Sequence, residues 1–262
     1  MTSAQLTDAS NLLWEHWTGG RRLAQIPESL RPSSRADGYA VQATLEQRSG
    51  GPLFGWKIAA TSVAGQKHIN VDGPLAGRLL KERAFESGAT VPFGVNHMRV
   101  AEAEFAFRMG RDLTPQWGPF GVAEVVEAVA SLHPAIEIPD SRYDDFTIVG
   151  AAQLIADDAC AHYFVLGDAS PASWRDVDLA AHPVRGEVAG KLTRDGVGSN
   201  VLGDPRIALT WLANELSSLG VTLRAGQVVT TGTCLVPLEI APGDRVRMDF
   251  GALGRIDCSM SS

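Results

Sequence analysis

The sequence predicts an α+β fold in which a helical segment precedes a body made mostly of β-strands. Residues 7–18 carry a polar start, apolar residues at helical spacing and a closing pair of glycines, which are the marks of a short helix. Residues 34–47 place alanines and a leucine on one helical face. From Phe54 onward, short runs of β-forming residues alternate with glycine and proline. We therefore expect a helical N-terminal arm over residues 1–50 and a β-rich domain over residues 51–262.

Two helices are expected to interrupt the strands of the body. One covers about residues 122–132, and the other begins at Asp204, a favourable N-cap, with Pro205 in its first turn and a stop at Gly220. Near the end of the chain, two strands joined by the four-residue loop 251–254 predict a hairpin. The expected strands carry the sequences GWKIAA, HMRVAEAEFAF, AIEI, QVVTTG, RVRMDF and RIDCSM.

Composition and charge narrow the class of protein. With 262 residues, of which 45% are hydrophobic and 20% charged, the chain has the composition of a folded globular protein. A net charge of -7 and the lack of a Lys/Arg-rich run argue against nucleic acid or an anionic membrane as the main partner. No segment approaches the roughly 18–20 apolar residues of a membrane span, and the first ten residues do not resemble a signal peptide. The 3 cysteines are too few for a disulfide framework, so we expect a cytoplasmic protein that acts on small molecules.

Two glutamates interrupt an apolar run at residues 100–107, VAEAEFAF. Side chains alternate between the faces of a strand, so Glu102 and Glu104 share one face while alanines and phenylalanines occupy the other. Solvation of the outer face would explain an isolated pair of this kind, because most glutamates lie at the surface. Alternatively, the two carboxylates hold a hard divalent cation such as Mg²⁺ or Mn²⁺.

Two further charged residues lie in apolar, strand-like runs. Glu137 stands between two isoleucines in AIEI, and it could be a third metal ligand, an edge-strand residue or the partner of Arg142. Arg142 could instead face a substrate carboxylate. Lys57 lies in GWKIAA, where it either extends to solvent or stays near the cation, partly desolvated, with a lowered pKa that suits proton exchange.

A series of motifs extends the pattern over nearly the whole chain. They are GWKIAATS (55–62), VDGPLAGRL (71–79), AEAEFAF (101–107), AIEIPDSR (135–142), IADDA (155–159), GSNVLGDP (198–205), WLANEL (211–216) and PGDRVRMDFGALG (242–254). In this order they resemble the 2-keto-4-pentenoate hydratase family of the fumarylacetoacetate hydrolase superfamily. That family also includes 2-oxohept-4-ene-1,7-dioate hydratase and 4-oxalocrotonate decarboxylase.

The resemblance implies a fold, a metal site and a catalytic residue. The fold would be a fumarylacetoacetate hydrolase-like rolled mixed β fold with a helical N-terminal arm, assembled as a homo-oligomer, and residues 51–262 would form the catalytic domain. Glu102, Glu104 and Glu137 fall on the three metal-binding glutamates of the family, and Lys57 falls on its active-site lysine. The cation would be Mg²⁺ or Mn²⁺, and the partner a small 2-oxo acid.

Some positions depart from the family pattern. Family hydratases commonly have an acid where this chain has Leu75, and a segment that usually reads A-D-N-A-S reads here as Ala156 to Cys160, ADDAC. Asn200 also changes the expected lining of the site. These differences leave the exact substrate and the reaction type open. We expect Ser62, Asp72, Leu75, Ser199 and Thr231 to line the site, although ordinary loop and capping roles explain the polar ones equally well.

The implied activity is that of a metal-dependent hydro-lyase. It would add water to a 2-hydroxy-2,4-dienoate, such as 2-hydroxypenta-2,4-dienoate, to give a 4-hydroxy-2-oxo acid in the catabolism of aromatic compounds. A decarboxylase of a 2-oxo-3-enedioate, of the 4-oxalocrotonate type, is the alternative on the same scaffold. An acylpyruvate hydrolase is less well supported because no His-Glu pair is evident, and a non-catalytic partner subunit would not need all three glutamates and Lys57. The histidines at 68, 97, 133 and 162 are expected in packing or surface roles.

Overall fold

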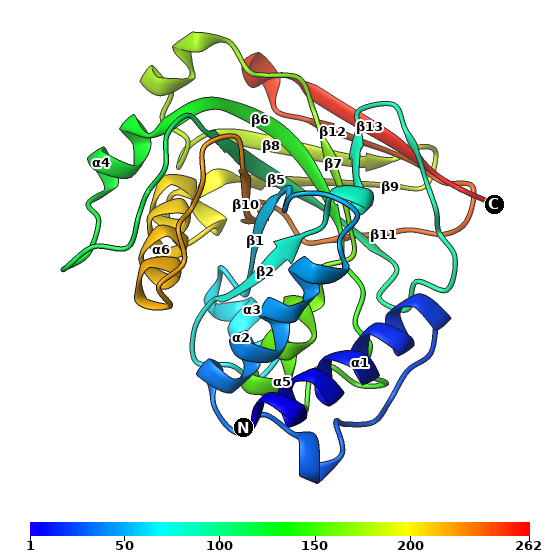
Figure 1. Cartoon of the computed structure of the whole chain (residues 1–262). Coiled ribbons are helices and arrows are strands. Elements are labelled where there is room, and N and C mark those ends of the chain that lie inside the picture. The colour runs from blue at the N-terminus through cyan, green and yellow to red at the C-terminus, as the bar shows by residue number, and fades with distance from the viewer.

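The strands form two sheets that share one hydrophobic core (Figure 1). The computed structural model describes the whole chain, residues 1–262. The larger sheet runs in the order β2 (Leu75–Leu79), β1 (Gly55–Ala59), β10 (Val228–Thr233), β5 (Val100–Met109), β6 (Val129–Ile138), β7 (Tyr163–Leu166) and β3 (Ala84–Glu86), with β11 (Leu238–Glu239) beside β5. The smaller sheet runs in the order β4 (Thr90–Val91), β13 (Arg255–Met260), β12 (Arg245–Asp249), β8 (Pro183–Val188) and β9 (Leu192–Val197).

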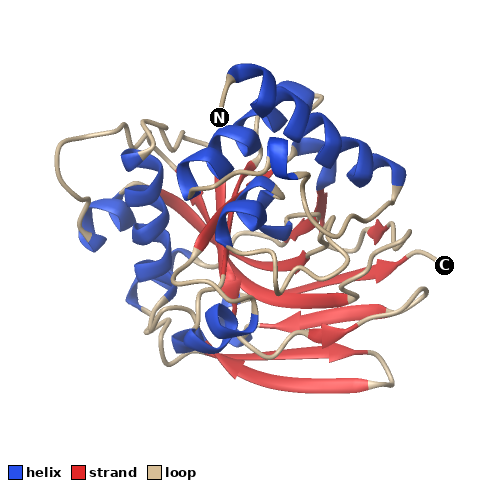
Figure 2. Cartoon of the chain, turned by 90° about the horizontal axis from the view of Figure 1, so that it is seen from below, coloured by secondary structure: helices blue, strands red, loops and turns tan.

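The helices lie in two groups beside the larger sheet (Figures 1 and 2). One group lies near β1 and β2, and the other lies along β10, where α6 packs against it. None of the helices combines the length and the hydrophobicity that crossing a membrane requires. The first group consists of α1 (Ser3–Gly19), α2 (Arg35–Ala43), α3 (Val63–His68) and α5 (Ala151–Ala156), and the second of α4 (Val122–Glu127) and α6 (Pro205–Ser218).

Both helices predicted in the first fifty residues are present, but α1 begins at Ser3 rather than near residue 7, and α2 ends at Ala43, where a 3₁₀ segment over Thr44–Arg48 takes over. In α1, Thr2 and Gln5 form a reciprocal capping box, and Gly20 ends the helix in the left-handed conformation at φ 62°. Ser34 caps α2 by accepting a hydrogen bond from the backbone of Asp37. In the body, Asp204 caps α6 by accepting from the backbone of Arg206, as expected. The division into an arm of residues 1–50 and a domain of residues 51–262 stays a prediction.

The two faces of β5 differ as the alternation predicts. Ala101, Ala103, Phe105 and Phe107 are fully buried in the common core. The ring of Phe105 lies 5.1 Å from that of Phe250, which follows β12, so this face packs against the smaller sheet. The glutamates therefore occupy the opposite face. Burial of the aromatic face fixes which way the carboxylates point, because a shift of one residue would exchange the faces.

The predicted helix over residues 122–132 is wrong at its C-terminal end. Helix α4 ends at Glu127, and β6 begins at Val129, six residues before the start of the run AIEI. Strand β6 pairs with β5 without interruption from Glu137, opposite Glu102, to Ser131, opposite Arg108. This long ladder outweighs the local helical pattern, since tertiary pairing commonly overrides propensity. The C-terminal hairpin of β12 and β13 is present as predicted.

The larger sheet is strongly curled. Strands β1 and β6 are separated by β10 and β5, so in a flat sheet they would lie about 14 Å apart, three strand spacings. Yet Lys57 Nζ on β1 lies 2.9 Å from Glu137 Oε1 on β6. The concave face of the sheet thus brings together side chains from strands that are not neighbours.

Candidate active site

Three carboxylates meet on the concave face of the larger sheet. Glu102 of β5 lies directly opposite Glu137 of β6 in the antiparallel ladder, and Glu104 follows two residues along β5 on the same face. One carboxylate oxygen of each lies within 4.8 Å of one from each of the others. The structure therefore brings together the three glutamates that the sequence analysis singled out.

Glu104 is held in place by the neighbouring strand. Its Oε2 accepts hydrogen bonds from the hydroxyl of Thr230 and from the backbone N–H of Gly232, the latter at 2.7 Å. Its Oε1 is buried and has no hydrogen-bond partner. One oxygen is thus fixed by β10, and the other remains free to bind a ligand.

Lys57 extends from β1 toward the same place. Its side chain is buried, and Nζ donates a hydrogen bond to the carbonyl of Ala159 at 2.9 Å in addition to its ion pair with Glu137. Glu137 Oε2 keeps no hydrogen-bond partner. The expectation that Lys57 extends to solvent is therefore wrong, because the curl of the sheet turns its strand face inward.

A glycine makes room for the lysine. Gly77 of β2 lies opposite Lys57 in the ladder, and a Cβ on Gly77 would lie 3.0 Å from Lys57 Cγ and Cδ and 2.4 Å from the carbonyl oxygen of Asp158. Asp158, Ala159 and Cys160 form a turn in which all three residues have φ between 49° and 62°. This left-handed conformation is costly for non-glycine residues, so the surrounding packing must impose it. The turn presents the Ala159 carbonyl to Lys57.

The electrostatics of the cluster show an excess of negative charge. Burial, and then the charge of Glu137, raises the pKa of Glu102 to about 7, and the same causes raise the pKa of Glu104 well above its usual value. Burial opposes the charged form of Lys57, but Glu137 and Glu102 outweigh it and raise the pKa of the amine. The lowered lysine pKa expected from the sequence is therefore not found, because desolvation is only one of the two terms.

These residues fit a divalent cation. The carboxylates supply hard oxygen ligands, and two of their buried oxygens lack partners, which is costly unless a positive charge is added. Ligands of one Mg²⁺ lie about 2.1 Å from the ion and thus at most about 4.2 Å apart, close to the separation in this cluster. Glu102, Glu104 and Glu137 are therefore the residues that would hold such an ion.

A large cavity opens beside the cluster. It has a volume of about 740 Å³ and reaches both Lys57 and Glu102. Of the predicted lining residues, Ser62 and Leu75 line it, and Ser62 also caps α3 by accepting from the backbone of Gly65. Asn200 lines it as well, with its amide donating to the carbonyl of Cys234 at 2.7 Å.

Three predicted lining residues lie elsewhere. Asp72 is highly exposed and lies 3.8 Å from Arg35 in a surface ion pair. Ser199 is exposed and does not line the cavity. Thr231 is buried, and its hydroxyl donates to the carbonyl of Phe105, on the face away from the glutamates. Thr230, one position earlier on β10, is the residue that contacts Glu104, and strand alternation is the signal that separates the two.

Arg142 contacts neither Glu137 nor the cavity, the two alternatives that the sequence left open. It is buried, and its guanidinium donates to Asp157 and to the carbonyls of Asp140 and Ala161. It also lies 4.2 Å from the centre of the Trp17 ring. Glu137 is instead paired with Lys57. Sequence separation could not distinguish these partners, since Glu137 and Arg142 leave the end of β6 in different directions.

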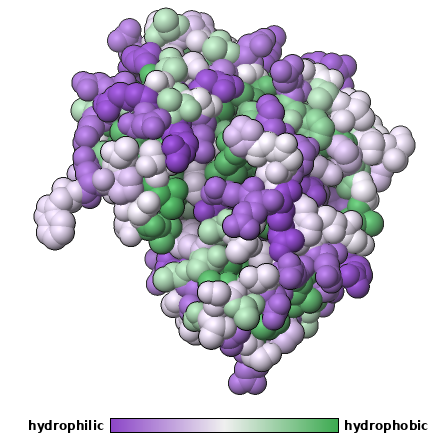
Figure 3. All heavy atoms as spheres, viewed as in Figure 1, coloured by the Kyte–Doolittle hydropathy of each residue, from purple (hydrophilic) through white to green (hydrophobic).

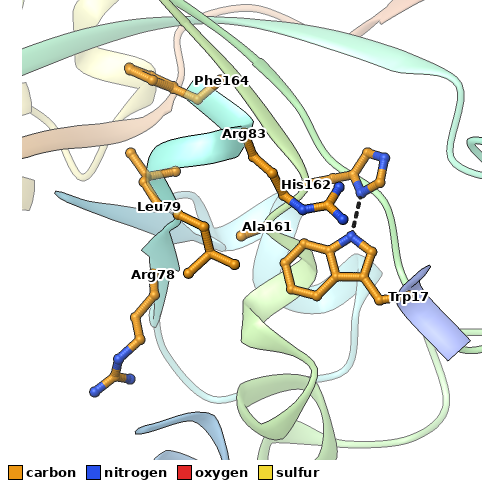
Figure 4. A pocket seen from close by; sticks show the side chains of 8 residues that line it. Trp17, Arg78, Leu79, Arg83, Ala161, His162 and Phe164 are labelled. Atoms are coloured by element: carbon orange, nitrogen blue, oxygen red, sulfur yellow. Dashed lines mark hydrogen bonds between the residues drawn. The ribbon is translucent and has the colours of Figure 1, made fainter. Parts of the chain in front are cut away.

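Four of the 6 histidines, those for which the sequence analysis made a prediction, divide into two pairs. His162 accepts a hydrogen bond from Trp17 Nε1 at 2.8 Å, and Arg83 lies 4.4 Å above the same tryptophan ring (Figure 4). His133 is buried and contacts the carbonyl of Gly167. Both are packing residues, as expected. His68 and His97 line the cavity, which their polar, loop-rich sequence surroundings did not indicate.

Comparison with known proteins places this site in a family. Residues 75–260 match the model of the fumarylacetoacetate (FAA) hydrolase C-terminal family. The chain belongs to the fumarylacetoacetate hydrolase family. The chain is 32% identical to a 2-keto-4-pentenoate hydratase of Paraburkholderia xenovorans over 265 residues, covering 100% of this chain and 97% of that protein. It is 34% identical over 252 residues to a 2-hydroxyhexa-2,4-dienoate hydratase of Comamonas testosteroni, covering 92% of each.

A solved structure has nearly the same fold. The 4-oxalocrotonate decarboxylase of Pseudomonas putida G7, complexed with magnesium and adipate, superimposes with a TM-score of 0.89 at 26% identity, covering 99% of this chain and 98% of that one. The same decarboxylase has also been solved with calcium and acetate. The predicted rolled mixed β fold with a helical N-terminal segment is therefore confirmed.

Proposed function

We propose that this protein is a metal-dependent hydro-lyase that adds water to a 2-hydroxy-2,4-dienoate in the catabolism of aromatic compounds. The observation that carries the proposal is the convergence of Glu102, Glu104 and Glu137 on one point beside Lys57 and a large cavity. Relatives named as hydratases of 2-keto-4-pentenoate and 2-hydroxyhexa-2,4-dienoate align with the chain over nearly its full length. The substrate would be 2-hydroxypenta-2,4-dienoate or a related acid.

The three glutamates would hold Mg²⁺ or Mn²⁺. A cation bound there supplies a Lewis acid that stabilises negative charge on the 2-oxo oxygen of the substrate. Magnesium and calcium are the ions in the solved decarboxylase complexes, which supports a hard divalent ion in a site of this type. Thr230 and the backbone of Gly232 would keep Glu104 oriented, because both donate hydrogen bonds to its Oε2 and leave its Oε1 available to the cation.

Lys57 would transfer the proton that starts the reaction. Its amine would pass a proton to C5 of the bound dienoate, and the proton of the 2-hydroxyl group would restore the charge of the amine. Water then adds its hydroxyl group to C4 and its remaining hydrogen to C3, which gives the 4-hydroxy-2-oxo acid. Leu75 lines the cavity and cannot supply a proton. Lys57 is the one lysine or arginine that lines it, so it is our candidate for the proton donor.

The test is a direct assay of the purified protein. The ultraviolet absorbance of 2-hydroxypenta-2,4-dienoate is followed with Mg²⁺, with Mn²⁺ and with EDTA, and the product is identified by mass. We expect metal-dependent loss of absorbance with a product heavier by one water and without release of CO₂. Loss of absorbance that EDTA does not affect would contradict the metal site, and no conversion of any 2-hydroxydienoate would contradict the hydratase.

Decarboxylation is the second candidate, because the decarboxylase of Pseudomonas putida G7 shares the fold at a TM-score of 0.89. A cation held by the three glutamates would stabilise the dienolate that a 2-oxo-3-enedioate forms when its C5–C6 bond breaks and C6 leaves as CO₂, and a proton on the 2-oxo oxygen would then give the 2-hydroxydienoate. Release of CO₂ from 4-oxalocrotonate, faster than hydration of the dienoate, would favour this function. A partner subunit without activity would give neither reaction.

The chain would act as a cytoplasmic homo-oligomer. The loop between β5 and α4 projects from the body (Figures 1 and 3), and it carries the fully exposed side chain of Trp117. Large exposed aromatic residues commonly mark protein contacts. All three cysteines are free and buried, as suits a reducing compartment. Light scattering of the purified protein should give a mass above the 27.9 kDa of one chain, and Trp117→Ser should lower it.

A further inference from the structure

The cavity beside the glutamates has few charged residues. Of the 26 residues that line it, 14 are hydrophobic, and the ionisable side chains of the usual acids and bases are those of Lys57, Glu102, His68 and His97, of which Lys57 is the one lysine. The amine of Lys57 is already engaged by Glu137 and by the carbonyl of Ala159. No arginine lines the cavity. A second carboxylate on a bound acid would therefore lose its hydration without gaining a cationic partner, which is costly.

The volume of the cavity exceeds the needs of a short acid. At about 740 Å³ it lies in the range of roughly 300–1,000 Å³ that is typical for drug-sized ligands. A five-carbon dienoate is much smaller than that. Leu75 in β2 lines this space and adds an apolar side chain to its wall.

Apolar walls continue from the glutamates to the mouth. Leu235 is buried and lines the cavity, whereas Val236 lines it and is 67% exposed. His68 and Phe146 also line the cavity, and their rings lie 6.0 Å apart, edge to face. The ring of His97 is tied to the carbonyl of Asp144 at 3.3 Å. An extended apolar chain could thus pass from the acid cluster to solvent along a largely hydrophobic path.

We infer that the substrate is a monocarboxylic 2-hydroxydienoate whose distal end is an apolar group longer than a methyl group. The inference rests on the proposed function for the reaction, and on the cavity alone for the shape and charge of the ligand. It excludes diacids of the oxalocrotonate type as preferred substrates. The glutamate cluster with its cation would bind the 2-oxo acid end of the substrate. The apolar walls of the cavity would select the chemistry of its distal end.

Binding of unreactive analogues tests the cavity independently of turnover. In the presence of Mg²⁺, dissociation constants are measured by calorimetry for 2-oxopentanoate, 2-oxooctanoate and 2-oxoadipate. Burial of one methylene strengthens binding about fourfold, so 2-oxooctanoate should bind at least about tenfold more tightly than 2-oxopentanoate. 2-Oxoadipate should bind at least about tenfold more weakly than 2-oxooctanoate. Affinity that does not depend on chain length, or equal affinity for the diacid, overturns the inference.

A variant that adds a positive charge to the cavity wall sharpens the test. Val236→Arg places a cation on the cavity wall, and because residue 236 is largely exposed, the longer side chain has room. This variant should bind 2-oxoadipate at least about fivefold more tightly than the unmodified protein does and lose its preference for 2-oxooctanoate. Val122→Arg on α4 is the matched control, since Val122 is 42% exposed and does not line the cavity. An equal effect of both variants would attribute the change to net charge and overturn the inference.

Turnover separates this inference from the proposed function. If the analogues bind as expected but no dienoate is hydrated, the hydratase fails and the assignment of the ligand's tail stands. If 2-hydroxypenta-2,4-dienoate is hydrated with a higher kcat/KM than homologues with longer alkyl ends, the hydratase stands and the inference fails. Both stand if kcat/KM rises with the length of the alkyl end.

Discussion

The glutamate cluster and the Arg142–Asp157 pair both bury charge, but only one of them is complete. Every polar group of the pair has a partner: the guanidinium of Arg142 contacts Asp157 and three carbonyls, and Asp157 also accepts from Ser141 and from the backbone of residue 142. In the cluster, three carboxylates share a single ammonium group, and buried oxygens of Glu104 and Glu137 have no hydrogen-bond partner.

The difference indicates what each region contributes. A buried ion pair with all its hydrogen bonds made holds elements together, and breaking it is costly. A buried cluster in which three carboxylates share one ammonium group has too little positive charge to balance it. We expect a further positively charged group, such as a bound cation, to complete it. We therefore expect changes in the Arg142–Asp157 pair to act on stability, and changes in the cluster to act on metal binding and turnover.

The largest expected effect follows the loss of a carboxylate from the cluster. Glu104→Gln keeps the shape of the side chain but replaces the negatively charged carboxylate with a neutral amide. Because a Lewis acid contributes several kcal/mol to stabilisation of the transition state, turnover should fall by about 10³-fold or more. Mg²⁺ affinity, measured by calorimetry, should fall with it. Glu239→Gln on exposed β11 is the control, and a similar loss there would contradict the assignment.

Replacement of the lysine should affect turnover more than metal binding. Lys57→Met keeps the apolar stem in its buried channel and removes the proton donor, which should lower kcat by about 10²–10⁴-fold. Mg²⁺ affinity should stay the same or rise, because a positive charge next to Glu137 is lost. Unchanged kcat in a folded Lys57→Met protein would exclude Lys57 from the proton transfer.

The Arg142–Asp157 pair gives the opposite result. Arg142→Met leaves the Asp157 carboxylate buried without its cation and should lower the free energy of unfolding by about 3–5 kcal/mol. Urea denaturation measures the change, and Mg²⁺ affinity of the folded fraction should not change. A stable variant with weakened metal binding would show that the two regions are not separate.

Metal removal should reveal the strain in the cluster. A cation bound by the native state alone stabilises it by about 2.7 kcal/mol at a concentration of 100 times its dissociation constant. EDTA should therefore lower the melting temperature of the unmodified protein by several degrees and leave that of Glu104→Gln unchanged. An equal shift for both proteins would place the stabilising ion elsewhere.

A smaller effect is expected from pH at His162. Burial, and then Arg83 and Arg142, lower the pKa of His162 well below its usual value, so the folded state keeps the ring neutral. The unfolded chain binds a proton near pH 6.5, so stability is complete above that pH and falls by at most about 1.4 kcal/mol per unit below it. His162→Gln should flatten this slope in denaturation experiments between pH 7 and 5. An unchanged slope would assign it to other groups.

Strand alternation predicted that Glu102 and Glu104 share one face of a strand, but it left open whether that face meets solvent or a cation. The family resemblance, not the alternation, singled out the set of three glutamates. The two helices within residues 1–50 could also be predicted, because their capping residues and helical periodicity are local features of the sequence. The neighbours of Arg142 and the length of β6 could not be predicted from the sequence, because both depend on how strands that are far apart in the sequence pair and how the sheet curls. Thr230 was missed by one residue, and only the register of β10 against β5 tells it from Thr231.

The position of Lys57 in the chain has one more consequence. The segment that matches the family begins at Leu75, so the three glutamates lie within it and the lysine lies before it, on a strand laid parallel to β10. The proposed ligands of the cation and the proposed proton donor therefore lie in successive stretches of the chain, and the pairing of β1 between β2 and β10 is what joins them into one site.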